Sequence, residues 1–259
     1  MRRLVLRTLF LLSVFFIHFK SSFSQNFISE NTSDSASIKA AIELYHQYLS
    51  PETGLYDGSE YTYNTYYPFT INEGHPFFES KNFETGSVFY NNMLYENVPL
   101  LYDVIHEELL TRDPSKINII RLNESKVKWF TIYGHTFIRV VKDGSPGSLL
   151  STGYYDVLYQ GNTSLYKKVS KLFKENSSSF QGLNKYVAEN DEYFIKKGSG
   201  YFKIKSRKNL LSVLADRKKE IGQFMAKNKL KLRKNKEYAL LKTVAYYDKL
   251  NTNLTKTNN

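Results

Sequence analysis

The 259-residue chain contains no cysteine. This excludes disulfides, thiolate nucleophiles, and zinc or iron–sulfur sites that need cysteine ligands. A secreted domain without disulfides must be stable through its core alone, and a chain of this length can bury a core of the required size. The absence of disulfides is more typical of a bacterial envelope protein than of a eukaryotic secreted domain.

The chain also lacks the short motifs of several catalytic classes. It has no G-x-S-x-G elbow, no H-E-x-x-H pair and no G-x-x-x-x-G-K-[ST] phosphate loop. His75, His106 and His135 lie among aromatic residues without metal-ligand spacing, so we expect structural histidines and neither a metal nor another cofactor. The positions of carboxylates such as Asp103 and Asp156 in the sequence do not show whether they lie close together in the fold. We expect a protein without enzymatic activity, and the alternative is a periplasmic hydrolase.

Residues 1–24 have the three parts of a secretory signal peptide. Three arginines precede an apolar run (TLFLLSVFFIHF), and the following SFS supplies small residues for cleavage after Ser24. The run is shorter than the roughly 20 residues of a spanning helix. We expect export to the periplasm or outer membrane of a Gram-negative bacterium, with no transmembrane span after cleavage. A retained anchor is the alternative.

Positive charge is concentrated near the end of the chain. Residues 25–195 contain 14 basic and 21 acidic residues, whereas residues 196–236 contain 15 basic and two acidic ones. One interpretation is a solvated helix face whose lysine stems cover an apolar stripe. The other is contact with an anionic envelope surface or glycan. The candidate basic binding residues are Lys218, Lys219, Lys231, Arg233 and Lys234.

Nucleic acid is not an expected partner of this basic region. The signal peptide directs the chain away from nucleic acid, and the region has no helix-turn-helix, RNP or zinc-finger pattern. A basic patch without such a pattern is only an electrostatic footprint.

The hydropathy pattern predicts an α+β fold, with a curved antiparallel β meander of about eight to ten strands. Turn signals such as Asn91-Asn92 and Gly161-Asn162 separate the strands. We expect five segments: 1–24 as signal peptide, 25–50 as a polar leader with a short helix, 51–205 as the β domain, 206–250 as a basic helical subdomain packed on it, and 251–259 as a disordered tail.

Aromatic residues make up 15% of the chain. Several of them gather just after residue 60, where Tyr63, Tyr66 and Tyr67, with Tyr61 and Phe69 beside them, could form a stacking platform for sugars. The alternative is that these residues fill a β-rich core, which tyrosine and phenylalanine favour. A sugar-binding module is therefore a third functional hypothesis.

Several segments, spread over nearly the whole mature chain, resemble segments of a known protein family. They include LYDGSEY, GHPFF, NVPLLYDV, YGHTFIRV, GYYDVLYQG and the basic stretch ADRKKEIGQFMAKNKLKLRKNKEYALLKTVAYYDKL. Together they resemble an uncharacterised family of exported proteins of Bacteroidota. The resemblance implies an envelope location and brings no activity or catalytic residues with it.

Overall fold

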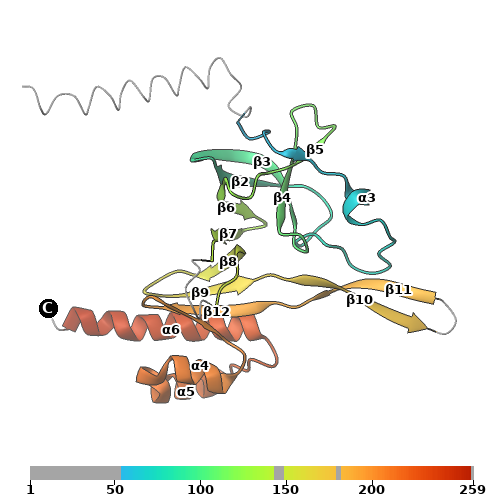
Figure 1. Ribbon diagram of the computed structural model, residues 1–259. Coiled ribbons are helices and arrows are strands. Elements are labelled where there is room, and N and C mark those ends of the chain that lie inside the picture. Colours follow the sequence, from blue (N-terminus) through green and yellow to red (C-terminus); the bar gives the residue numbers. More distant parts are fainter. Residues whose placement is uncertain (1–53, 143–148, 179–181, 258–259) are drawn as a thin grey trace, which may run out of the picture. The chain divides into compact units, whose positions relative to one another are not determined.

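The computed structural model describes residues 54–142, 149–178 and 182–257. Within these residues, 13 strands form one eleven-stranded sheet and one two-stranded sheet, accompanied by a few helices (Figure 1). The predicted α+β class and antiparallel pairing are confirmed, but the predicted number of strands was too low. The expected signal peptide (1–24) and the polar leader with its short helix (25–50) lie outside the described residues.

The strands of the large open sheet are antiparallel neighbours in the order β1-β5-β4-β3-β2-β6-β7-β8-β9-β12-β13. Their bounds are β1 Ser59–Glu60, β2 Glu84–Tyr90, β3 Met93–Asp103, β4 Glu108–Arg112, β5 Ile119–Arg121, β6 Val127–Ile132, β7 His135–Val140, β8 Gly153–Tyr159, β9 Thr163–Lys168, β12 Glu192–Lys197 and β13 Gly200–Lys203. The second sheet pairs β10 (Lys171–Ser178) with β11 (Gly182–Glu189).

Tight turns join several successive strands where the sequence predicts them. Asn91 and Asn92, between β2 and β3, both have positive φ angles of 49° and 64°. Tyr133 and Gly134, between β6 and β7, have φ angles of 53° and 77°. Two consecutive left-handed residues are the backbone of a type I′ turn, which matches the twist of a hairpin.

The strand order departs from a simple meander after β5. In the predicted meander, consecutive strands such as β5 and β6 would pair with each other, but β6 pairs with β2 instead. Tyr102 on β3 and Tyr154 on β8 lie four strands apart, which in a flat sheet is about 19 Å at roughly 4.8 Å per strand. Their ring centroids are only 5.7 Å apart. The sheet therefore bends around an aromatic core that includes Phe130 and Phe137.

Helices follow the large sheet and cover part of it. They are α4 (Arg207–Val213), the 3-10 turn η1 (Ala215–Arg217), α5 (Lys218–Lys227) and α6 (Lys236–Thr257). Helix α6 contacts β8 and β9, while α5 packs on α6 and α4 packs on α5 (Figure 1). Buried apolar residues from these elements form a second core, which includes Leu165, Ile195, Leu210, Leu214, Ile221, Leu240, Val244 and Tyr247.

Two helices differ from the sequence-based expectation. Helix α3 (Tyr63–Tyr66) is a single helical turn within the segment that the sequence assigned to the β domain. Helix α6 continues to Thr257, so residues 251–257 are helical where the sequence predicted a disordered tail. No proline or glycine follows Leu250 to stop the helix. The side chain of Asn251 also accepts a hydrogen bond of 3.5 Å from Arg217.

Candidate functional site

Asp103, the last residue of β3, is the most completely buried carboxylate of the β domain, with an exposed fraction of 0%. Its Oδ1 accepts hydrogen bonds from the backbone N–H groups of Ile105 and His106, at 3.1 and 3.2 Å. These bonds shape the turn between β3 and β4. A carboxylate removed from water needs such donors, because burial without them costs several kcal/mol.

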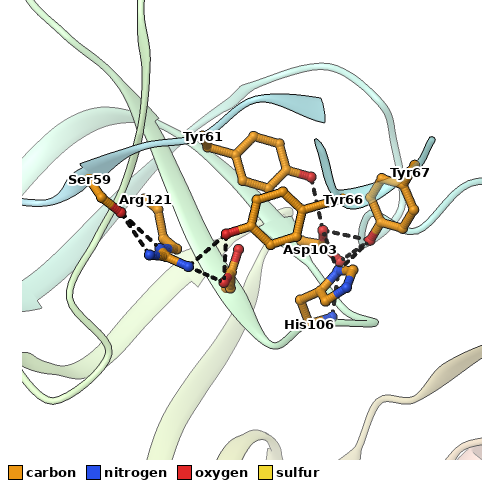
Figure 2. Close-up of polar contacts among 8 residues, drawn as sticks. Ser59, Tyr61, Tyr66, Tyr67, Asp103, His106 and Arg121 are labelled. Carbon is orange, nitrogen blue, oxygen red and sulfur yellow. Dashed lines mark hydrogen bonds and ion pairs between the residues drawn. The ribbon is translucent and has the colours of Figure 1, made fainter. Parts of the chain in front are cut away.

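Two tyrosines from the segment around α3 complete the shell of this carboxylate (Figure 2). The hydroxyl of Tyr67 donates to Asp103 at 2.7 Å, and the hydroxyl of Tyr61 donates at 3.0 Å. Burial, followed by the adjacent carboxylate, raises the pKa of both tyrosines far above the usual value. Both hydroxyls therefore stay protonated and keep donating at every physiological pH.

His106 lies at the edge of this network. Its Nδ1 is 3.3 Å from Asp103 Oδ2 and 2.8 Å from the hydroxyl oxygen of Tyr67. The carboxylate can only accept, and the hydroxyl hydrogen of Tyr67 is already directed at Asp103, so we infer that Nδ1 carries the hydrogen. In the neutral ring, Nε2 then keeps its lone pair. The His106 side chain is 34% exposed and lines a cavity of about 390 Å³.

The same cavity contains an anchored arginine. Arg121 Nη1 donates to Glu108 at 2.8 Å and to the hydroxyl of Tyr66 at 2.6 Å, while Nε and Nη2 donate to Ser59 (Figure 2). Most of the guanidinium donors are thus engaged within the protein. The buried Oε2 of Glu108 has no hydrogen-bond partner among the described residues. Arg121 fixes the cavity wall and is not a free anchor for an anion.

A second histidine–aspartate pair connects β7 to β8. His135 Nδ1 lies 2.7 Å from Asp156, whose exposed fraction is 1%. The hydrogen bond to Asp156 raises the pKa of His135 despite the opposing effect of burial. By contrast, burial lowers the pKa of His75, whose Nδ1 has no partner among the described residues. Within the described ranges, no three His, Asp or Glu side chains form a metal-binding group.

The proposed aromatic platform is divided by the fold. Tyr67 and Tyr61 are buried, with exposed fractions of 2% and 4%, and their hydroxyls belong to the Asp103 network. Tyr66 is partly buried, stacked on Tyr61 at 4.6 Å. Tyr63 is the most exposed of the four, at 38%. The aromatic cluster therefore positions Asp103 and presents one tyrosine ring to solvent.

A different kind of site lies on the helical part of the chain. We use the name basic groove for a hollow of about 1180 Å³ between the start of α4, the end of α5 and the link that leads to α6. Its basic residues are Lys205, Arg207, Lys208, Lys229, Lys231, Arg233, Lys234 and Lys236, and no acidic residue lines it. None of these eight forms an ion pair with a described residue.

The structure separates the basic residues that the sequence grouped together. Lys231, Arg233 and Lys234 line the basic groove. Lys218 and Lys219 do not, because they face a second hollow that they share with acidic residues of η1 and α5. Five further groove cations were missed. A signal for part of them was available in the stretch KLKLRK, in which basic residues alternate with two leucines. In the structure this link is built of turns, and its basic and apolar side chains line the same hollow.

No family model, curated protein or solved structure matches this chain. In the residues that the structure describes, no helix is both long and apolar enough to cross a membrane. The interpretation of the two sites therefore depends on their own chemistry.

The Asp103 network predicts that removing the hydroxyl group from each of two neighbouring tyrosines lowers the free energy of unfolding by different amounts. Tyr67→Phe removes a donor to a buried carboxylate and should lower the free energy of unfolding by about 1–3 kcal/mol. Tyr63→Phe is the matched control, and should change it by less than about 0.5 kcal/mol because this side chain is partly exposed. Urea denaturation measures both. Equal values for the two variants would contradict the network.

The His135–Asp156 pair predicts a pH dependence of stability. Because the folded state raises the pKa of His135, the stabilisation is fully present below about pH 6.5 and is lost as the pH rises through the folded-state pKa. The difference in unfolding free energy between the wild type and His135→Asn should therefore be larger near about pH 5.5 than near about pH 8.5. Urea denaturation at both pH values tests this, and a difference that is independent of pH would contradict it.

Proposed function

We propose that this protein is an exported envelope protein that binds an anionic component of the envelope through the basic groove. The observation that carries the proposal is the set of eight cationic side chains around one hollow without an acidic residue. Support for export comes from the signal-peptide pattern of residues 1–24 and from the resemblance to exported proteins.

The ion pairs of two largely buried lysines outside the basic groove support this proposal by contrast. Lys167 pairs with Asp191 and Glu237, at 3.0 and 2.9 Å, and Lys168 pairs with Glu107 at 2.5 Å. The fold thus pairs these two largely buried lysines with acidic side chains. The groove cations repel one another without such partners, so an anionic ligand that enters the groove relieves repulsion and adds attraction.

Binding to vesicles tests the groove. The double reversal Lys231→Glu with Lys234→Glu should weaken binding to phosphatidylglycerol vesicles by roughly 30-fold, if each lysine contributes about 1 kcal/mol near an anionic surface. Co-sedimentation at low and at physiological salt (about 0.15 M) gives the affinities, and binding should weaken at the higher salt.

The matched control is Lys218→Glu with Lys219→Glu. It changes the net charge by the same amount on α5, outside the basic groove. It should leave most of the vesicle binding intact. Equal losses in the two double variants would mean that net charge alone drives the association, and absence of vesicle binding by the wild type would remove the proposal.

A second candidate function, hydrolysis of an acyl ester, is favoured by one observation. Asp103 keeps Nδ1 of His106 protonated, so that Nε2 could take a proton from water at the wall of the 390 Å³ cavity. The water oxygen would attack the acyl carbon, and the imidazolium would return the proton to the leaving alkoxide as the ester bond breaks.

Hydrolysis of p-nitrophenyl acetate tests this second function. His106→Asn should lower kcat/KM by about 100-fold or more, the usual contribution of a general base. His135→Asn is the control, because His135 is also bonded to a buried aspartate but does not line this cavity. Equal rates for the two variants would exclude His106 as a general base.

A further inference from the structure

The basic groove has an apolar floor as well as a cationic rim. Met225 and Ala226 come from the last turn of α5, and Leu230 and Leu232 come from the link. Met225 and Leu230 are almost fully buried beneath the hollow, Leu232 is partly exposed and Ala226 is exposed. A surface that binds only negatively charged groups does not require an apolar floor. The stems of the surrounding lysines extend the apolar surface further.

Backbone hydrogen bonds hold the rim and the floor in one arrangement. The N–H of Leu230 donates to Met225 at 2.9 Å, and the N–H of Lys229 donates to Ala226 at 3.1 Å. Lys229 adopts a left-handed conformation (φ 53°) that closes the end of α5. A second turn forms where the N–H of Lys234 donates to Lys231 at 3.0 Å. The site is therefore pre-organised, which lowers the entropy lost on binding.

The size and composition of the hollow indicate the kind of ligand. Its volume of about 1180 Å³ is above the roughly 300–1,000 Å³ that is usual for small-molecule pockets, so it is too large for a lone phosphate. Arg207 and Arg233 on the rim have planar guanidinium groups, which suit the bidentate recognition of a phosphate.

We propose that the basic groove binds one phosphate-bearing amphiphile, with its headgroup on the cationic rim and an acyl chain along the apolar floor. This inference rests on the proposed function and makes it more specific, because a flat electrostatic contact with a membrane would need no space for a chain. The ligand class is an anionic lipid with at least one free acyl chain.

Titration calorimetry with monomeric probes tests the inference. The probes are lysophosphatidylglycerols of increasing chain length, each below its micelle concentration, together with glycerol phosphate and lysophosphatidylcholine. We expect one molecule bound per chain, with lysophosphatidylglycerol at least roughly 100-fold tighter than glycerol phosphate. Each added methylene should tighten binding by up to roughly fourfold until the floor is covered. Lysophosphatidylcholine should bind more weakly than its anionic counterpart.

Variants assign the two halves of the ligand to the two parts of the groove. Leu232→Ser should reduce the dependence of affinity on chain length, whereas Leu149→Ser, which alters an exposed leucine of the β domain, should not. Lys231→Glu with Lys234→Glu should abolish the preference for lysophosphatidylglycerol over lysophosphatidylcholine. Circular dichroism of each variant confirms that it is folded.

The outcomes separate this inference from the proposed function. Equal affinity for glycerol phosphate and for every lysophosphatidylglycerol would contradict the inference that the basic groove binds an acyl chain. Groove-dependent binding to anionic vesicles would still support the proposed function in that case. Equal affinity for the anionic and the zwitterionic lysolipid, or equal effects of Leu232→Ser and Leu149→Ser, would also overturn the inference. Absence of binding to both lysolipids and vesicles would remove both proposals.

Discussion

A buried carboxylate constrains the β domain. Asp103 lies at 0% exposure, and burying its charge costs several kcal/mol unless donors surround it. The donors come from the turn after β3 and from Tyr61 and Tyr67, about 40 residues earlier in the chain. The segment before β2 must therefore lie across the end of β3, where the N–H of Phe78 also donates to Tyr102 at 2.8 Å. The same turn presents Glu107 to Lys168 on β9 and so helps to hold the bent sheet together.

Charged side chains of this protein lie in two opposite kinds of environment. In the β domain, three buried or largely buried ionisable groups are paired: Asp103 with tyrosines, Asp156 with His135, and Lys167 with two carboxylates. No acidic residue lines the basic groove, and its cations surround apolar side chains without forming ion pairs among the described residues. Pairing at short distance offsets the desolvation cost of a buried charge, whereas like charges gathered around a hollow repel one another unless a ligand neutralises them. This contrast is the reason why we propose a binding role for the basic groove and a structural role for the Asp103 network.

Much of the local structure could be predicted from the sequence. The Asn91-Asn92 turn and its β2–β3 hairpin were predicted because a tight turn depends on two adjacent residues with left-handed conformations. The pairing of β6 with β2 was not predicted, since it depends on the bend that brings Tyr102 against Tyr154 across four strands. The extension of α6 to Thr257 was also missed, since the contact of Asn251 with Arg217 joins residues 34 positions apart in the sequence.

The sequence by itself determined the segregation of positive charge, the exclusion of cysteine chemistry and the antiparallel hairpins, because these depend on composition or on neighbouring residues. Only the tertiary structure decided which cations share a site: Lys231 and Lys234 line the basic groove, and Lys218 does not. Only the tertiary structure gave Asp103 its two tyrosines and His106 its tautomer. These contacts join residues that are distant in the chain, and their distances follow from strand pairing and packing, which no local pattern encodes.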